Sequence, residues 1–489
     1  MNIVDMDVLT LRENLLNKNL KVYEVIEAFL KRIEQTEDKI DALLYINKEK
    51  ALEEAKILDQ KGPDPDKPLW GIPCTIKDIL TTKDIPTTCA SKILENFVPF
   101  YDAEAVKRLK DAGAIILAKA NMDEFAMGSS NENSAFKITK NPWNLEKVPG
   151  GSSGGSAASV SARQAPFSLG SDTGGSIRLP ASFCGVVGLK PTYGRVSRFG
   201  LIAYGSSLDQ VGPITRTVKD AALILKVIAG KDEKDSTSSP MPVEDYLNGI
   251  DELKDLQGIK IGIPKEYWET ELDEDVREEC EKVVETLKRL KAEIVPISLP
   301  HTPYTIATYY IIIMAEASSN LARYDGVRYG FRYSEAKDFI DMFIKSRSLG
   351  FGPEVQRRIV LGTYVLSAGY YDAFYKKAAQ VRRLIQEDFF KGFEKCQIMC
   401  APVSPTPAFK IGEKADPLQM YLSDVFTASI NLAGIPAISI PAGIGKRSKL
   451  PVGIQFFAMP FKEKELLKIT NLIEKEIGQL PKPFELERS

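Results

Sequence analysis

The chain has 489 residues, of which 44% are hydrophobic and 27% charged, which is the composition of a globular protein with a large core. Lys and Arg (64) nearly balance Asp and Glu (66), and the net charge of −2 excludes the basic surface of a protein that binds nucleic acid on its own. The first residues lack the basic segment and apolar core of a signal peptide. The most apolar run, 305–315, is shorter than the roughly 20 residues of a membrane span. We therefore expect a soluble, cytoplasmic protein.

The first half of the chain alternates between helix-like and strand-like patterns. Apolar residues at helical spacing predict helices within residues 7–60 and over 102–112. Short apolar runs predict strands at 71–77, 114–118, 165–169 and 186–189. Strands that alternate with helices predict an α/β fold, with a large, mixed, mostly parallel central sheet covered by helices on both faces.

The second half begins with a polar stretch, 231–255, which we expect on the surface. The predicted strands are 260–264, 293–297, 437–441 and 452–456, and the predicted helices are 273–291, a block over 303–393, and 418–432. Tyrosine is frequent in the helical block, and because aromatic residues at helical spacing usually lie in a core, we expect most of these to be buried. They are Tyr304, Tyr309, Tyr310, Tyr324, Tyr329, Tyr364, Tyr370, Tyr371 and Tyr375.

Cysteine and histidine give no sign of a metal site. The six cysteines lie among apolar neighbours, without a C-x-x-C pair or a nearby histidine, so we expect buried, reduced thiols and no metal. The single histidine, His301, stands between prolines in a turn-like context. A Ser-His-Asp triad would depend on this one residue, so we do not expect one.

Two clusters of glycine and serine stand out from the rest of the chain. They read Pro-Gly-Gly-Ser-Ser-Gly-Gly-Ser at 149–156 and Gly-Ser-Asp-Thr-Gly-Gly-Ser-Ile-Arg at 170–178. A flexible linker is one interpretation, but the core-like sequence around both clusters favours tight turns or close approach of the backbone to a ligand. No phosphate-loop or dinucleotide signature is present. Backbone N–H groups beside serines suit an oxyanion better than a nucleotide.

A nucleophilic serine needs a base, and lysine can replace histidine in this role. Lys77 follows a strand-like apolar run. Burial there would disfavour the ammonium form and lower the pKa toward that of a useful base. The alternative is a lysine whose head reaches water at the end of a strand.

Together, Lys77 and the two clusters resemble the amidase signature family, whose members use a Ser-cisSer-Lys triad. By position, the resemblance implies that Ser176 is the nucleophile, Ser152 the bridging serine in a cis peptide bond, and Lys77 the general base. It also implies an oxyanion hole made by four backbone N–H groups, those of Thr173, Gly174, Gly175 and Ser176.

Further short motifs resemble those of the glutaminase subunits of tRNA-dependent amidotransferases. They lie at 121–128, 195–201, 207–213, 316–321, 357–359 and 369–373, and the resemblance extends from about residue 9 to about residue 457. It implies a single amidase signature domain over 1–489. Its parts would be an N-terminal helical segment (1–60), a catalytic signature core (70–220) and a helical insertion on the substrate side (300–395).

The resemblance also implies a glutamine site. Glutamine carries an α-carboxylate and an α-ammonium, so its site needs a cation and an anion. Arg358 would hold the carboxylate through a bidentate contact, and Asp424 would take the ammonium. Tyr309 would add a hydroxyl contact, and Ser129 is a further candidate. The choice of Arg358 over its neighbour rests on the resemblance alone.

The implied reaction is hydrolysis of glutamine to glutamate and ammonia. Ammonia would pass to partner subunits B and C of a heterotrimer, where ATP and Mg²⁺ would drive amidation of misacylated Glu-tRNA(Gln) or Asp-tRNA(Asn). This chain would hold no cofactor itself, and the tRNA would lie mainly on a partner. Two alternatives stay open: a stand-alone amidase for small or aryl amides, and a scaffold subunit without activity.

Overall fold

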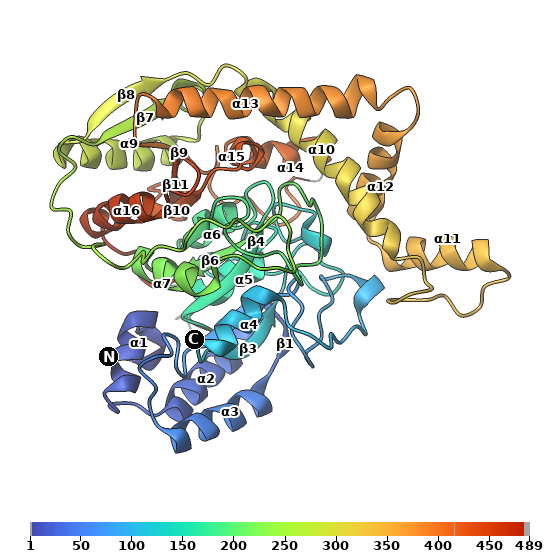
Figure 1. The fold of residues 1–489 in the computed structure, drawn as a ribbon, viewed down its shortest axis with the longest axis horizontal. Coiled ribbons are helices and arrows are strands. Elements are labelled where there is room, and N and C mark those ends of the chain that lie inside the picture. The colour runs from blue at the N-terminus through green and yellow to red at the C-terminus, as the bar shows by residue number, and fades with distance from the viewer. Residues whose placement is uncertain (1, 415, 484–489) are drawn as a thin grey trace.

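The computed structural model describes residues 2–414 and 416–483 and is built on one 11-stranded sheet (Figure 1). The strands follow one another in space in the order β1-β3-β2-β4-β6-β5-β10-β11-β9-β7-β8. Their bounds are β1 Leu43–Ile46, β2 Pro73–Lys77, β3 Ile115–Ala120, β4 Phe167–Asp172, β5 Val187–Lys190, β6 Gln210–Thr215, β7 Lys260–Pro264, β8 Glu293–Ile297, β9 Ile398–Pro402, β10 Ala437–Ile444 and β11 Pro451–Ala458.

The sheet is mixed, as predicted, but the expectation that it is mostly parallel is wrong. Among the described strands, β2 pairs in parallel with β3 and β4, and β7 with β8 and β9. The other six pairings are antiparallel. The difference arises in the middle of the sheet, where β10 and β11 form a hairpin and β6 lies antiparallel between β4 and β5. Antiparallel neighbours need only a short connection, so alternation of strands and helices along the chain does not reveal them.

Sixteen α-helices are described in residues 2–414 and 416–483. They are α1 Val8–Leu16, α2 Val22–Ile40, α3 Lys48–Lys61, α4 Glu104–Asp111, α5 Gly154–Ser161, α6 Arg178–Cys184, α7 Val218–Ile228, α8 Lys265–Trp268, α9 Glu274–Arg289, α10 Thr305–Asn320, α11 Phe339–Gly350, α12 Pro353–Leu366, α13 Lys377–Phe393, α14 Pro417–Tyr421, α15 Ala428–Ala433 and α16 Glu463–Ile477. Within this described part no helix is both long and apolar enough to cross a bilayer.

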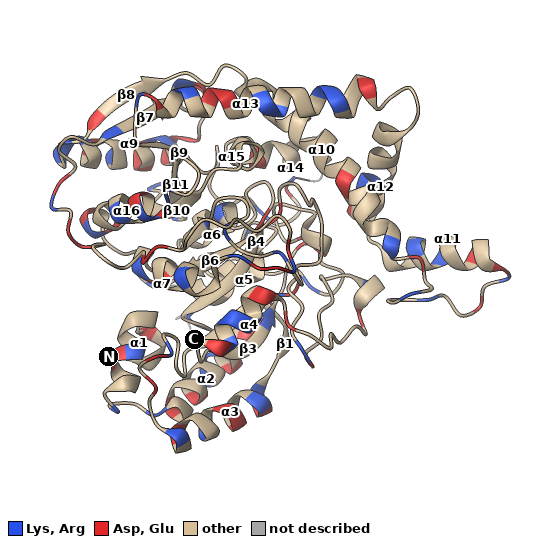
Figure 2. Cartoon of the chain, viewed as in Figure 1, with Lys and Arg blue, Asp and Glu red and all other residues tan. Residues whose placement is uncertain are grey.

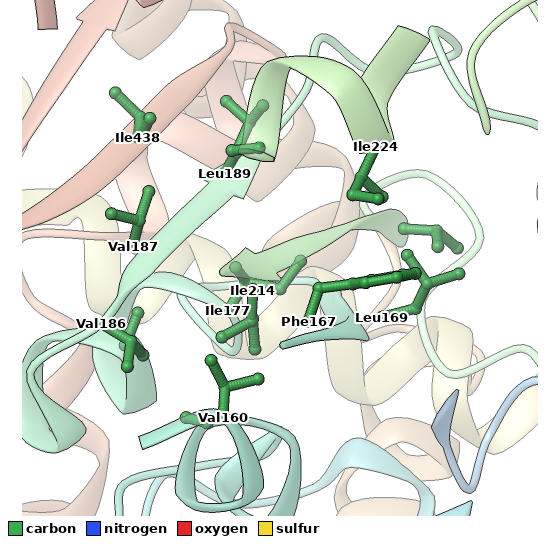
Figure 3. Close-up of a cluster of buried hydrophobic side chains, with 14 of the residues drawn as sticks. Val160, Phe167, Leu169, Ile177, Val186, Val187, Leu189, Ile214, Ile224 and Ile438 are labelled. Atoms are coloured by element: carbon green, nitrogen blue, oxygen red, sulfur yellow. The ribbon is translucent and has the colours of Figure 1, made fainter. Parts of the chain in front are cut away.

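Helices cover both faces of the sheet. Figure 3 shows β4 and β6 between Val160 of α5 on one side and Ile224 of α7 on the other. Phe167 and Leu169 of β4 are fully buried in this cluster. Burying a side chain of this size contributes roughly 1.5–3 kcal/mol, so the cluster fixes β4 firmly in the sheet. The chain leaves β4 at Asp172 and enters the second glycine- and serine-rich cluster.

The predicted helix over 418–432 is interrupted. The structure has α14, a short 3₁₀ turn over Leu422–Asp424, and then α15. The break turns Thr427 inward, where its hydroxyl donates to the carbonyl oxygen of Gly174 at 2.6 Å. A contact with a distant loop therefore replaces the continuous helix that the local pattern predicts.

The expectation that most tyrosines of the helical block are buried is also wrong. Tyr309, Tyr310 and Tyr324 are buried, whereas the tyrosines at 304, 329, 364, 370 and 371 are exposed. Figure 1 shows α11 and α12 projecting from the sheet, and Figure 2 shows acidic and basic residues mixed along most helices. Large apolar side chains on these two helices are exposed, and we call them the projecting surface: Phe339, Ile340, Ile344, Leu349, Val360, Leu361 and Tyr364.

Candidate active site

Three segments that are distant in sequence meet at one edge of the sheet. Lys77 ends β2, and Asp172 ends β4, which is parallel to β2 and adjacent to it. The carboxyl ends of neighbouring parallel strands share an edge of the sheet, which is where α/β proteins place their ligands. The first cluster enters α5 beside them, and the N–H of Ser153 donates to the carbonyl oxygen of Ser176 at 3.1 Å. Both clusters and the candidate base therefore belong to one site.

Lys77 is fully buried, so its head does not reach water at the end of the strand. Its Nζ donates to Ser152 Oγ at 2.7 Å and to Ser171 Oγ at 2.9 Å. Burial lowers the pKa of Lys77 from 10.5 to about 7, although the nearby carboxylates of Asp123 and Asp172 oppose the shift. A lysine with such a pKa is a usable base near neutral pH. Nothing in the sequence marks Ser171 as a partner of Lys77, because its position in the second cluster does not reveal which side chain it faces.

The peptide bond between Gly151 and Ser152 is cis, as the resemblance implies. Ser152 is fully buried, and its carbonyl oxygen accepts the N–H of Asp123 at 3.2 Å. Glycine is required at 151, because a Cβ there would lie 2.0 Å from Asp123 Oδ2. Ser176 is buried, and no hydrogen bond of its Oγ is recorded within residues 2–414 and 416–483.

The loop that carries Ser176 is held by Asp172. The Asp172 carboxylate accepts the N–H of Gly175 at 2.9 Å and that of Ile177 at 3.2 Å, and it pairs with Arg178. Burial alone would raise the pKa of Asp172, but Arg178 outweighs it and holds the pKa at about 2. The N–H of Gly175 is therefore committed to Asp172 and does not face a ligand, contrary to expectation. The other three N–H groups of the expected oxyanion hole have no partner recorded in the described part of the chain.

Tyr309 lies directly over this loop. A Cβ at Gly174 would come within 2.5 Å of the hydroxyl oxygen of Tyr309, so glycine permits the close approach. Tyr309 is buried, and burial raises its pKa well above the usual value. Its hydroxyl is therefore neutral and beside the backbone N–H groups that precede Ser176.

Asp424 and Ser129, both candidates for the glutamine site, are in contact. Ser129 Oγ donates to both carboxylate oxygens of Asp424 at 3.0 Å, and the Tyr310 hydroxyl donates to Oδ2 at 3.0 Å. Burial raises the pKa of Asp424 to about 7, against these hydrogen bonds. A buried carboxylate of this kind gains from an approaching cation.

Arg358, and not Arg357, faces the site. Arg358 is buried, whereas the side chain of Arg357 is 43% exposed. Arg358 Nε donates to Glu354 Oε1 at 2.8 Å, and its NH1 group donates to the hydroxyl of Tyr204. Its guanidinium also lies against three aromatic rings, those of Tyr204, Tyr310 and Tyr421. Cations bind favourably over such rings.

A cavity of about 450 Å³ reaches this group of residues. Its lining includes Glu124, Glu354, Arg357, Arg358 and Tyr421, but not Ser176. The cavity is therefore bordered by Arg358 and by Gly128 and Ser130, the neighbours of Ser129.

The remaining expectations from the sequence concern His301, the cysteines and metal binding. His301 pairs with Asp388 of α13, with 2.9 Å between Nδ1 and Oδ2, and takes no part in this site. The six cysteines are buried and free, as predicted. Within residues 2–414 and 416–483, no group of three or more His, Cys, Asp or Glu side chains could hold a metal ion.

A model of the amidase family matches residues 24–467 of the chain. The chain belongs to the amidase family. The family resemblance seen in the motifs is thereby confirmed. The three residues that the resemblance implies as a triad, Lys77, Ser152 and Ser176, are all buried in this amidase.

Three relatives show where this amidase stands in the family. The A subunit of the glutamyl-tRNA(Gln) amidotransferase from Solidesulfovibrio magneticus is 59% identical over 483 residues, which are 99% of each chain. A crystal structure of the corresponding protein from Thermotoga maritima is 42% identical with a TM-score of 0.81, covering 99% of this chain and 98% of that one. The peptide amidase from Stenotrophomonas maltophilia is 29% identical with a TM-score of 0.83, covering 98% of both. The fold is shared with the two solved structures, and sequence identity is higher with the two amidotransferase proteins than with the peptide amidase.

Proposed function

We propose that this amidase hydrolyses the side-chain amide of glutamine and is the glutaminase subunit of a tRNA-dependent amidotransferase. The observation that carries the proposal is that a buried guanidinium, Arg358, and a buried carboxyl group, Asp424, belong to one cluster of side chains around Tyr310. Free amino acids carry both charges that such a pair would bind. The names of the relatives, at up to 59% identity, support the same function.

The proposed reaction begins with neutral Lys77. Ser176 Oγ forms a bond to the amide carbon, its proton passes to Ser152 Oγ, and the proton of Ser152 passes to Lys77 Nζ, which lies 2.7 Å away. The carbonyl electrons move to the oxygen, and the N–H groups of Thr173, Gly174 and Ser176 would stabilise this oxyanion. Each such donor contributes about 3–4 kcal/mol to catalysis in serine hydrolases.

Ammonia then leaves and the acyl-enzyme is hydrolysed. The C–N bond breaks as the proton on Lys77 returns through Ser152 to the leaving nitrogen. Water attacks the ester at Ser176 and gives its proton to the same pair, and glutamate is released as the serine oxygen takes the proton back. Every proton in this scheme is returned, so the chain needs no metal or cofactor for hydrolysis.

Substrate selection would come from the buried charges. An uncharged amide that enters the site gains neither an ionic contact with Arg358 nor one with Asp424, so it binds more weakly than an amide that carries both charges. A stand-alone amidase for small or aryl amides has no need of Arg358 and Asp424, and a scaffold has no need of a buried lysine with a pKa of about 7. Both alternatives therefore account for less of the site.

The second half of the proposal concerns partners. Ammonia would pass to partner subunits B and C of a heterotrimer in the cytoplasm, where ATP and Mg²⁺ would be used to amidate misacylated Glu-tRNA(Gln) or Asp-tRNA(Asn). The chain's net charge of −2 supports placing the tRNA mainly on a partner. We assign the projecting surface to contact with these subunits, because many large apolar side chains exposed on two successive helices are typical of a protein–protein contact surface.

Ammonia release from glutamine tests the proposal. The chain is assayed alone and with its partner subunits and misacylated tRNA, beside a Ser176→Ala variant. We expect release that depends on Ser176 and rises with the partners. Equal or faster release from simple amides without partners would support a stand-alone amidase, and no effect of Ser176→Ala on any activity of the assembly would support the scaffold.

A further inference from the structure

Tyr310 touches both of the charged groups proposed to bind glutamine. Its hydroxyl donates to Asp424 Oδ2 at 3.0 Å, and the centre of its ring lies 5.3 Å from the guanidinium carbon of Arg358. It follows Tyr309 in α10 and is buried. One rigid side chain therefore spans the distance between the cation and the anion.

The ring of Tyr310 is fixed from two sides. It stacks on Tyr421 with ring centres 4.0 Å apart, and it meets Tyr309 edge-on at 4.9 Å. The hydroxyl of Tyr421 donates to Glu354 Oε1 at 2.8 Å, the same oxygen that accepts Arg358 Nε. These contacts close a ring of interactions from Tyr310 through Tyr421 and Glu354 to Arg358 and back. Tyr310 thus cannot shift without moving the guanidinium.

The other end of Tyr310 orients the carboxylate. Asp424 also accepts the hydroxyl of Ser129, which is shared between its two oxygens at 3.0 Å each. The hydrogen bond from Tyr310 goes to Oδ2 alone and so selects one rotation of the carboxylate. A rigid ring that is packed against the cation and bonded to the anion holds the two at one separation and one relative orientation.

A zwitterionic amino acid demands such a fixed separation. Its carboxylate and ammonium sit on the same carbon atom, so a site binds both only if the two protein charges are correctly spaced. We propose that Tyr310 sets the spacing of Arg358 and Asp424 and thereby makes the site selective for amides that carry both an α-carboxylate and an α-ammonium. This inference rests on the proposed function, because it takes glutamine as the substrate.

The test compares L-glutamine with glutaramate in the chain assembled with its partner subunits. Glutaramate has the same carboxylate and the same amide but lacks the α-ammonium. Tyr310→Phe keeps the ring against Arg358 and removes only the hydroxyl that Asp424 accepts. Because a hydrogen bond to a charged group affects binding by about 10- to 100-fold, we expect the ratio of kcat/KM for glutamine to that for glutaramate to fall by this factor, chiefly through the KM for glutamine.

Tyr309→Phe is the matched control, because it removes the neighbouring hydroxyl beside Gly174 and should affect both substrates alike. Turnover of glutaramate reports whether each variant is folded. Titration of glutamine and of glutaramate into Ser176→Ala, with and without Tyr310→Phe, gives the ratio of their dissociation constants in the absence of turnover. If Tyr310→Phe leaves the ratio of kcat/KM for the two substrates unchanged, or lowers kcat/KM equally for both, this inference is overturned and the proposed function is not. If the wild-type complex shows no Ser176-dependent release from glutamine, the proposed function fails and this inference fails with it.

Discussion

Replacing Lys77 by methionine separates the catalytic benefit of a buried base from its effect on stability. Burial lowers the pKa of Lys77 from 10.5 to about 7 in the folded protein. Between these pH values the unfolded chain holds a proton that the folded protein does not, so the free energy of unfolding rises with pH and is reduced below pH 7. Methionine has a similar length and no charge, and it removes this dependence.

The size of the effect follows from the two pKa values. At pH 7 the difference between them corresponds to about 4 kcal/mol of lost stability. The variant also loses the hydrogen bonds of Nζ with Ser152 and Ser171, which contribute roughly 1 kcal/mol each. We therefore expect Lys77→Met to be about 2 kcal/mol more stable than wild type at pH 7, with an advantage that shrinks by about 2–3 kcal/mol from pH 6 to pH 9. Its kcat should fall by about 10²- to 10⁴-fold, the usual contribution of a general base.

Denaturant unfolding at a series of pH values, followed by tryptophan fluorescence, measures this difference. Lys119→Met is the matched control, because Lys119 is an equally buried lysine on the adjacent strand but is paired with Asp78 at 3.1 Å. Its loss leaves the buried carboxylate of Asp78 without its ionic partner and should destabilise the protein by about 3–5 kcal/mol. A Lys77→Met advantage that does not change with pH would refute the reasoning, because Lys77 would then not titrate between the stated values.

Three further predictions concern the pH profile, the first cluster and the projecting surface. Because Lys77 accepts a proton only when neutral, kcat/KM for glutamine should rise with pH through about pH 7 and then level off, and a pH–rate profile that falls over this range would contradict its role as the base. Gly151→Ala forces a Cβ to within 2.0 Å of Asp123 Oδ2. The free energy of unfolding, measured by thermal unfolding, should therefore fall by roughly 2–4 kcal/mol, and activity should be lost. A variant as stable as wild type would show that the loop has room for the methyl group. Ile340→Asp should weaken co-purification with the partner subunits at least tenfold without changing the fold. Its control is Ile57→Asp, because Ile57 is an exposed isoleucine on α3, away from the projecting surface. If both variants retain the partners equally, the projecting surface is not the contact surface.

The sequence predicts the catalytic half of the site well, because its signal is local. The expected triad serines lie within strings whose composition is unusual for a core, whereas Lys77 ends an apolar run. The structure places Lys77 against Ser152 as expected. The same holds for strands such as β7 and β8, whose bounds agree with those predicted. A short apolar run between polar residues carries enough information to mark a buried strand.

The substrate half could not be assembled from local patterns. Four residues surround Arg358 only because α10, α12, the end of α14 and the loop before β6 come together: Tyr310, Glu354, Tyr421 and Tyr204. Each of these residues is ordinary in its own segment, so no spacing rule marks it. The pair of tyrosines at 309–310 is the one local feature of this region that stands out, and by itself it indicates packing in a core and not a substrate site.

The order of the strands in the sheet could not be predicted from the sequence for a related reason. β1, β6 and β9 were not predicted, and β6 and β9 both take antiparallel neighbours within the sheet. β6 contains a glycine and a proline, and these residues weaken the strand signal. Its place between β4 and β5 depends on pairing across the sheet, which no single stretch of sequence encodes.

Helix α12 carries Arg358 and, one turn further, the exposed Leu361 of the projecting surface. A helix moves as a unit, so a partner that presses on the outer side of α12 also acts on the guanidinium at its inner side. Linkage then requires reciprocity: whatever factor docking contributes to the affinity for glutamine, glutamine contributes to the affinity for the docked partner. If the proposed partner docks on this surface, one helix would match the supply of ammonia to the presence of the subunit that consumes it.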